Sequence, residues 1–142
     1  NSNLISIEYL KFAVKNSNHP TYRDVKNLQP TSVIALFVDS VKSIIFIQKA
    51  DMPGYPWRNQ MAFPGGNCDP DDFSREKTAL RELEEELQIY PDEVEIIGSI
   101  GHFQTINNKD IEAFLGIWKE IRDITYDKRE ISRVLQYRWS IF

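Results

Sequence analysis

Residues 63–89, FPGGNCDPDDFSREKTALRELEEELQI, join a sharp glycine turn to an acidic helix. After the Pro-Gly-Gly turn comes a polar loop, in which Asp72 or Ser74 is suited to cap the N-terminus of a helix. From about residue 73 to residue 87 the apolar side chains recur at helical spacing, and Pro91 ends the helix. We expect one buried stripe on this helix, formed by Phe73, Leu80, Leu83 and Leu87.

Three glutamates of this helix fall on one ridge beside the buried stripe. Glu85 and Glu86 follow Glu82 by three and four residues, whereas Glu84 points to roughly the opposite side. Carboxylates gathered in this way favour a hard divalent cation, which takes oxygen ligands. Arg81, four residues before Glu85, is placed to brace a carboxylate through charge-assisted hydrogen bonds. Taken alone, however, the cluster is more typical of a solvated glutamate-rich helix face.

The residues upstream of the helix point to a more specific interpretation. Gly66, five residues, Asp72, eight residues and then RELEEELQI at 81–89 resemble the Nudix box. That family's pattern is Gly, five residues, Glu, seven residues, then Arg-Glu-aliphatic-x-Glu-Glu-x-Gly-aliphatic. Asp72 replaces the usual Glu and stands one residue further from Arg81, while Gln88 replaces the usual Gly. Gln88 must therefore close the helix at a position where glycine normally supplies a positive φ.

The Nudix resemblance implies an enzyme that hydrolyses a nucleoside diphosphate linked to another moiety. It implies that the cofactor is Mg²⁺ or Mn²⁺ and that the metal ligands are Glu82, Glu85, Glu86 and the carbonyl of Gly66. Divalent cations neutralise the charge of a diphosphate and acidify a bound water. A nearby carboxylate is then needed as general base; Glu82 or Glu85 is the candidate, and Arg81 completes the catalytic set. The base varies within the family, and downstream acids such as Glu112 or Glu130 could contribute.

A narrower resemblance concerns the substrate. Residues 63–72 and TALRE at 78–82 are similar to the Phe-Pro-Gly-Gly-x-x-Asp-Pro-x-Asp loop and the helix start of coenzyme A diphosphatases. That branch also has an upstream coenzyme A motif, which this sequence matches in part: Lys49 stands for an Arg and Asn59 for a Gly. The resemblance implies that coenzyme A or a derivative is the substrate. It also implies that the substrate contacts are Lys49, Arg58 and Gln60.

Two other functions stay open. In the first, the reaction is the same but the substrate is ADP-ribose or a nucleotide sugar. For either substrate, Tyr55 and Trp57 could stack on an adenine or merely cap the core. In another functional class, the chain is a catalytically silent Nudix-fold sensor that binds a nucleotide. Such modules usually lose one or more box carboxylates, whereas all three are present here. His102 is interpreted as a packed, hydrogen-bonded residue rather than a catalyst.

The whole sequence predicts an α/β (α+β) fold, a Nudix-type mixed β-sheet sandwiched between helices. A helix is expected over residues 4–15, strands over 33–38, 43–48, 94–100, 112–118 and 131–139, and a polar loop over 104–110. The run VIALFV at 33–38 is continuously apolar, as in a strand buried on both faces. The 142 residues are expected to form a single Nudix hydrolase domain. The family's C-terminal helix would start where the sequence stops, so that helix is either missing or replaced by the N-terminal segment.

Composition and charge narrow the range of partners. The net charge is −4 and no long Lys/Arg block is present, which argues against binding to a nucleic-acid duplex. No apolar run approaches transmembrane length, so no membrane partner is expected. The single cysteine, Cys68, excludes an intramolecular disulfide and a cysteine-based zinc site, which fits the reducing cytoplasm. The expected ligand is a small-molecule nucleotide diphosphate, bound by a monomer or homodimer.

Overall fold

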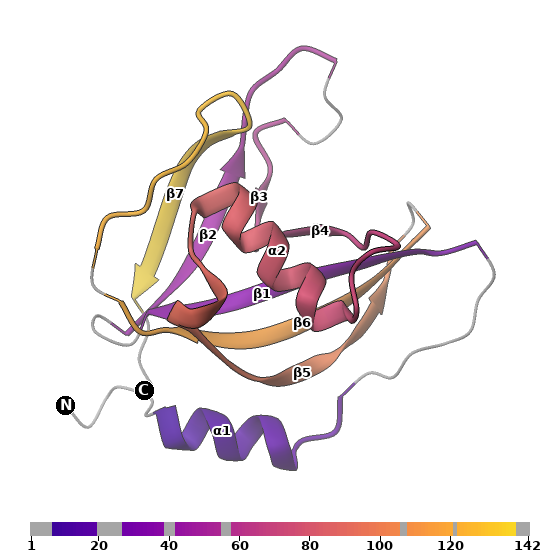
Figure 1. Ribbon diagram of the computed structural model, residues 1–142, viewed down its shortest axis with the longest axis vertical. Coiled ribbons are helices and arrows are strands. Elements are labelled where there is room, and N and C mark those ends of the chain that lie inside the picture. Colours follow the sequence, from indigo (N-terminus) through magenta and orange to yellow (C-terminus); the bar gives the residue numbers. More distant parts are fainter. Residues whose placement is uncertain are drawn as a thin grey trace.

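The computed structural model describes residues 7–19, 27–38, 42–54, 58–105, 108–120 and 122–138. Its helices are α1 (Ile7–Asn16), α2 (Arg75–Leu87) and the short 3₁₀ helix η2 (Pro91–Glu93). Its strands are β1 (Gln29–Val38), β2 (Ser43–Lys49), β3 (Met61–Ala62), β4 (Gly65–Asn67), β5 (Val94–Gln104), β6 (Lys109–Trp118) and β7 (Ile131–Arg138). Figure 1 shows α2 lying across the strands and α1 beside β5. Within the described ranges, no helix combines the length and the apolar character needed to span a membrane.

The seven strands form one mixed sheet, which confirms the predicted fold class. The main strand order is β3-β2-β1-β6-β5; β1 and β6 are parallel, and the other pairs are antiparallel. β1 has two antiparallel neighbours in succession: residues 31–33 pair with β4, and residues 36–38 pair with β2. β7 pairs with β2, so the end of β2 and the start of β7 lie side by side.

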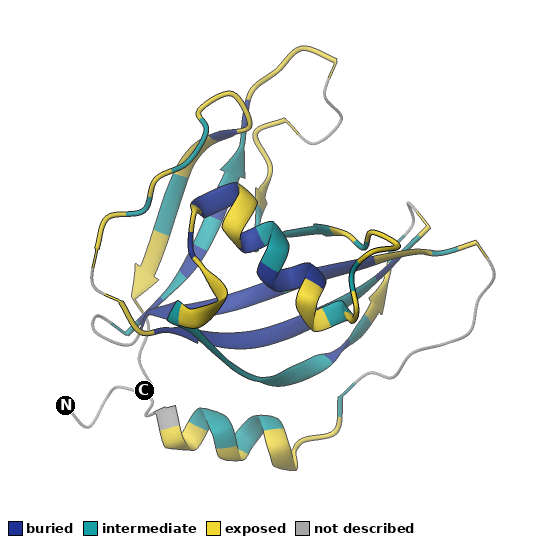
Figure 2. Ribbon diagram, in the orientation of Figure 1, coloured by how far each residue is buried: buried dark blue, intermediate teal, exposed yellow. Residues whose placement is uncertain are grey.

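The sheet is packed by a helix on each face, as predicted. Figure 2 shows the central strands buried, and alternate residues of β1 face different helices. The larger core joins the sheet to α2 and includes Ile34, Leu36, Leu83 and Leu87. The smaller core joins the opposite face to α1 and includes Ala35, Phe37, Leu10 and Val14. The continuous apolar run of β1 is thus explained by burial on both faces.

Helix α2 forms where it was predicted but begins only after its cap. The N-cap is Ser74, whose Oγ accepts a hydrogen bond from the Lys77 N–H at 3.1 Å. Gln88 closes the helix in the left-handed conformation, with φ of 54°, and donates its N–H to the Glu84 carbonyl. Phe73 therefore precedes the helix and is 97% exposed, so its assignment to the buried stripe was wrong. A residue before the N-cap does not share the angular phase of the helix.

Several predicted strand bounds were also wrong. The polar loop expected over 104–110 is much shorter, because β5 continues to Gln104 and β6 begins at Lys109. β1 begins at Gln29, ahead of its apolar run, and the short strands β3 and β4 were not predicted. The expected first helix and last strand are observed as α1 and β7; residues 4–6 and 139 of those predictions lie outside the described residues.

The substitution Leu83→Ala should lower the free energy of unfolding by about 2–5 kcal/mol, because truncation of a fully buried leucine leaves a cavity. Chemical denaturation followed by circular dichroism measures this change. Phe73→Ala is the control and should change the free energy by no more than about 0.5 kcal/mol, since its ring is exposed. A loss for Phe73→Ala as large as that for Leu83→Ala would contradict the exposed position of Phe73.

Candidate active site

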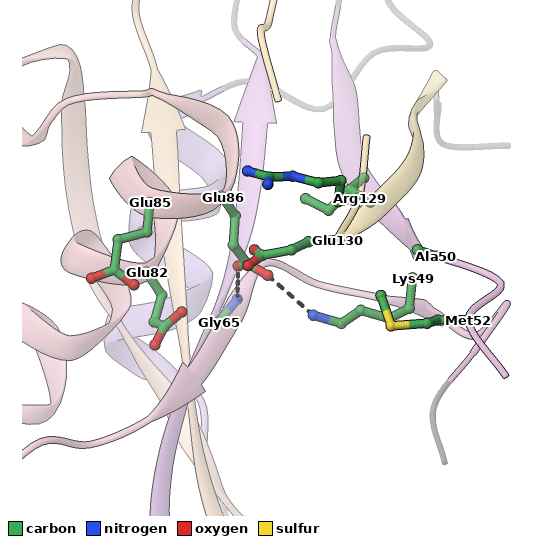
Figure 3. Close-up of a pocket in the computed structure, with 10 residues that line it drawn as sticks. Lys49, Ala50, Met52, Gly65, Glu82, Glu85, Glu86, Arg129 and Glu130 are labelled. Atoms are coloured by element: carbon green, nitrogen blue, oxygen red, sulfur yellow. Dashed lines mark hydrogen bonds and ion pairs between the residues drawn. The ribbon is translucent and has the colours of Figure 1, made fainter. Parts of the chain in front are cut away.

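Three glutamates of α2 open into one hollow of about 360 Å³. They are Glu82, Glu85 and Glu86, and they share the hollow with Lys49, Gly65 and Glu130 (Figure 3). The walls come from α2, from the glycine turn at β4 and from the adjoining ends of β2 and β7. The common ridge predicted from helical spacing is therefore confirmed. The volume falls within the range of small-molecule pockets.

Glu86 is the most deeply buried of the three carboxylates. Its side chain is 8% exposed, and the Gly65 N–H donates to its Oε1 at 2.8 Å. The Lys49 ammonium donates to the other oxygen, Oε2, at 3.1 Å (Figure 3). Burial raises the pKa of Glu86, although the charge of Lys49 and the Gly65 hydrogen bond oppose the shift. Both oxygens of this carboxylate are thus paired within the protein.

Glu82 packs against the backbone of the glycine turn. A Cβ atom at Gly66 would lie 2.5 Å from the carboxylate carbon of Glu82, and a Cβ atom at Gly65 would overlap the β1 strand. Glycine is therefore required at residue 65, where the contact is with strand backbone, whereas a side chain at residue 66 would displace the carboxylate of Glu82. Burial raises the pKa of Glu82; the charge of Arg81 opposes this shift, and the charge of Glu85 adds to it.

Arg81 braces the carboxylates, as predicted. Its Nη1 lies 3.1 Å from Oε1 of Glu82 and 3.2 Å from Oε1 of Glu85. Its Nε and Nη2 donate to the two oxygens of Asp72, each at 3.0 Å. Hydrogen bonding to Asp72 raises the pKa of Arg81, and the same interaction, with the backbone N–H of Asp69, lowers the pKa of Asp72. Asp72 therefore pairs with Arg81 despite the extra residue between them.

The side chains of this hollow suit a hard divalent cation in their chemistry, because carboxylate oxygens are its preferred ligands. In this structure they contact the protein's own cations instead: Arg81 bridges Glu82 and Glu85, and Lys49 holds Glu86. Among the described residues, no three acidic, histidine or cysteine side chains converge closely enough to hold a metal ion. Arg81 and Lys49 are thus the cations that balance these carboxylates in this structure.

Of the three predicted substrate contacts, Lys49 is the one that the structure brings to the carboxylates. Arg58 is exposed, and its side chain does not line the hollow. Gln60 is exposed as well, and its backbone carbonyl accepts the N–H of Lys49. Tyr55 and Trp57 lie outside the described residues. Substrate binding by Arg58 and Gln60 thus stays a prediction.

The two downstream acids are found in different places. Glu130 lines the hollow beside the box glutamates, whereas Glu112 does not. Oε2 of Glu112 lies 3.6 Å from Nε2 of His102, and Nδ1 of His102 lies 3.0 Å from Asp110. His102 is therefore a packed, hydrogen-bonded residue, as interpreted from the sequence. Glu130 is the downstream acid positioned to act with the three glutamates.

A buried polar cluster beside the start of α2 was missed by the sequence predictions. Asp110 is 1% exposed and pairs with Arg75 of α2 at 2.7 Å, with Gln104 at 2.8 Å and with His102 at 3.0 Å. Burial opposes the ionisation of Asp110, but these hydrogen bonds outweigh it and lower the pKa. The cluster ties α2 to β5 and β6. Gln104 and Asp110 were expected in a loop, so no periodic pattern indicated that they converge with Arg75 and His102.

A second hollow of about 420 Å³ adjoins the first at the glycine turn. The two hollows share Lys49 and Gly65 as walls. The second is also lined by Phe63, Asn67 and Lys109, and the Lys109 ammonium donates to the side-chain oxygen of Asn67 at 3.2 Å. The site therefore has room for an elongated ligand that passes from the carboxylates to a partly apolar, cationic surface.

A family model described as the NUDIX domain matches residues 28–139. The chain belongs to the Nudix family. The matched residues include every strand of the sheet as well as α2, and they leave α1 outside. The Nudix domain thus comprises the elements that build both hollows.

Similar known proteins support the assignment to the Nudix family. A relative in Yersinia pestis (strain Pestoides F), named "Uncharacterized Nudix hydrolase NudL", is 29% identical over 99 residues, which cover 70% of this chain and 49% of the relative. The chain therefore spans about half the length of the curated relatives that it matches. A C. elegans Ap4A hydrolase binary complex has a TM-score of 0.64 at 16% identity, over 76% of this chain and 79% of that one. The MutT protein from Methanosarcina mazei Go1 has a TM-score of 0.59 at 16% identity, over 79% and 78%. At these identities the solved structures show a shared fold.

Both departures from the Nudix box have a local structural solution. The shorter Asp72 still reaches Arg81, because it lies in the loop directly before the Ser74 cap. Gln88 adopts the left-handed conformation that glycine usually supplies, and its side-chain oxygen accepts the Thr125 hydroxyl at 2.7 Å. Both replacements are therefore accommodated at the two ends of α2.

The substitution Asp72→Asn should destabilise the protein at neutral pH, and the loss should shrink as the pH falls. The pKa of Asp72 is held below its usual 3.8, so its ionised form stabilises the fold above that value and this contribution disappears as the pH drops through the lower folded-state pKa. Urea unfolding of wild type and variant from neutral pH to below about pH 4 measures the difference. Asp71→Asn, at an exposed neighbour, should stay close to wild type. A difference for Asp72→Asn that does not vary with pH would contradict the ion pair as its cause.

Proposed function

We propose that this chain is a divalent-metal-dependent Nudix pyrophosphohydrolase that cleaves a nucleoside diphosphate linked to another moiety. The observation that carries this proposal is the single hollow lined by Glu82, Glu85 and Glu86 against the glycine turn. Glu86 is buried and Glu82 is 18% exposed, so their negative charge is poorly screened by water. A hollow of this composition favours cations and, through them, an anionic diphosphate.

The ligands of Mg²⁺ or Mn²⁺ in this proposal are Glu82, Glu85, Glu86 and the Gly66 carbonyl. When bound, the ion supplies charge neutralisation and an acidified water. Glu82 or Glu85 would accept the proton of the attacking water. Arg81 orients both carboxylates through Nη1. The water oxygen bonds to one phosphorus as the bridging P–O bond breaks, which yields two phosphate monoesters.

Within this class, we propose coenzyme A or a derivative as the substrate. The loop at 63–72 and the helix start at 78–82 support this choice through their resemblance to coenzyme A diphosphatases. The second hollow adds support, because Lys49 and Lys109 in its walls place positive charge beside an apolar surface. Such a surface suits the nucleotide half of the molecule. Lys49 in place of an Arg offers a point charge rather than a bidentate contact.

ADP-ribose or a nucleotide sugar is the second candidate, and one observation favours it. Arg58 and Gln60, which the coenzyme A resemblance requires as ligands, do not line the hollow of the box glutamates. A structure with the same fold carries the name Ap4A hydrolase, so diadenosine polyphosphates belong in the same comparison. A silent nucleotide sensor is disfavoured by the presence of all three box carboxylates in one hollow.

Composition supports the proposed setting of the reaction. The net charge of −4 supports a small-molecule substrate rather than a nucleic-acid duplex, and the single cysteine fits the cytoplasm. We propose that the protein acts in the cytoplasm as a monomer or homodimer.

A substrate screen tests the proposed function. With Mg²⁺ or Mn²⁺, product-mass analysis of coenzyme A, ADP-ribose, NADH and diadenosine polyphosphates should reveal cleavage at the diphosphate, and coenzyme A should give 3′,5′-adenosine bisphosphate and 4′-phosphopantetheine. Glu85→Gln should lower the rate by about 10²-fold or more, because it removes a metal ligand or the base. Glu84→Gln is the matched control and should retain activity, since Glu84 is exposed and lines a different hollow.

The other outcomes of the screen separate the candidates. Cleavage of ADP-ribose but not coenzyme A would keep the mechanism and discard coenzyme A as substrate. Tight binding of a nucleotide without turnover would identify a sensor. Activity that persists after chelation with EDTA would exclude the divalent-metal mechanism.

A further inference from the structure

Lys49 pairs with Glu86, the most deeply buried carboxylate of the first hollow. It is the last residue of β2, and its ammonium is directed at Glu86 (Figure 3). Nζ lies 3.1 Å from Oε2 of Glu86, and the two side chains are 21% and 8% exposed. The other Glu86 oxygen, Oε1, is held by the Gly65 N–H. Oε2 is therefore the oxygen whose partner can change without movement of the backbone.

An ammonium and a divalent cation repel each other at such a site. Screening by water and salt is weak where both partners are mostly buried, so the two cations cannot both remain at Oε2 of Glu86. We infer that Lys49 is a built-in counter-ion of Glu86, which neutralises this carboxylate when the metal is absent and is displaced when the metal binds. The inference rests on the proposed function, because it takes the box glutamates as metal ligands.

Of the two basic residues beside the carboxylates, Lys49 rather than Arg81 suits the role of a displaceable counter-ion. A buried carboxylate without a partner destabilises the folded state, so Glu86 needs a counter-ion before metal is bound. Lysine supplies one through a flexible stem and a single contact to Glu86. Arg81, by contrast, is fixed by two hydrogen bonds to Asp72. Lys49 is therefore the cation that can leave the carboxylates without breaking a second ion pair.

The second hollow can receive the displaced ammonium of Lys49. Lys49 lines both hollows, so rotation of its side chain carries Nζ from the first hollow to the second. There it joins Lys109 in facing the same space. Metal binding thereby adds positive charge to the surface that would receive the anionic substrate. By thermodynamic linkage, an anion bound in the second hollow should in turn strengthen metal binding.

Titration of the metal-free protein with Mn²⁺ alone, by isothermal calorimetry, tests the inference. Lys49→Met keeps the length of the side chain and removes its charge, so Mn²⁺ should bind about tenfold or more tightly than to wild type. Lys49→Arg retains a cation that pairs with Glu86 and should bind Mn²⁺ no more tightly than wild type. Arg129→Met is the matched control: it removes an 88% exposed cation from the same hollow, so its effect should be much smaller.

Thermal unfolding provides a second readout that is independent of activity. In EDTA, Lys49→Met should unfold at a lower temperature than wild type, because Glu86 has lost its counter-ion. Saturating Mn²⁺ should then raise its unfolding temperature by more than it raises that of wild type.

The outcomes distinguish this inference from the proposed function. If wild type binds no Mn²⁺, both fail. If wild type binds Mn²⁺ and Lys49→Met binds it equally or more weakly, Lys49 is a structural clamp for Glu86 and the counter-ion inference alone is overturned. If Lys49→Met does not fold, Lys49→Gln removes the same charge and should also bind Mn²⁺ more tightly than wild type; equal or weaker binding by that variant would overturn the inference.

Discussion

The close approach of α2 to the glycine turn is the constraint on which the site depends. β4 hydrogen-bonds to β1, so the turn is confined between a strand on one side and a helix on the other. Because glycine has no Cβ, Gly65 can donate its N–H to Glu86, and Gly66 can face the carboxylate of Glu82. A side chain at residue 65 would push the turn off β1, and one at residue 66 would displace the carboxylate of Glu82. The carboxylates would then no longer surround one space.

The sheet opens the hollow that these carboxylates surround. β1 pairs first with β4 and then with β2 along its length. Between the two partners, Ile34 donates its N–H to the Pro64 carbonyl at 2.9 Å, so this backbone donor of β1 remains paired. β2 and β4 therefore separate, and the far end of β2 brings Lys49 against Glu86 of α2. The irregular pairing of β1 is what gives the helix a space to face.

Local signals allowed α2 and the common side of its glutamates to be predicted, whereas tertiary contacts decided the rest. Phe73 was misplaced because the helical spacing was counted back through Ser74. Ser74 is the N-cap, so the helical phase begins only after it. The ends of β5 and β6 are polar and resemble a loop; Asp110 is buried there because Arg75, from a distant part of the chain, compensates its charge. Lys49 lies 37 residues from Glu86; the family resemblance placed it at the substrate, but no local pattern in the sequence pairs it with that carboxylate.

The two cations beside the carboxylates differ in how firmly they are held, and this difference determines how the hollow can respond to a ligand. Arg81 is anchored by Asp72 on the side away from the hollow, so replacing it at Glu82 would also disturb that pair. Lys49 is held at the most buried carboxylate by one contact. On the counter-ion inference, a divalent cation that binds at Glu86 therefore displaces Lys49 rather than Arg81. Arg81 holds Glu82 and Glu85 in place throughout, so on this inference the response of the hollow to a metal is confined to Lys49 and Glu86.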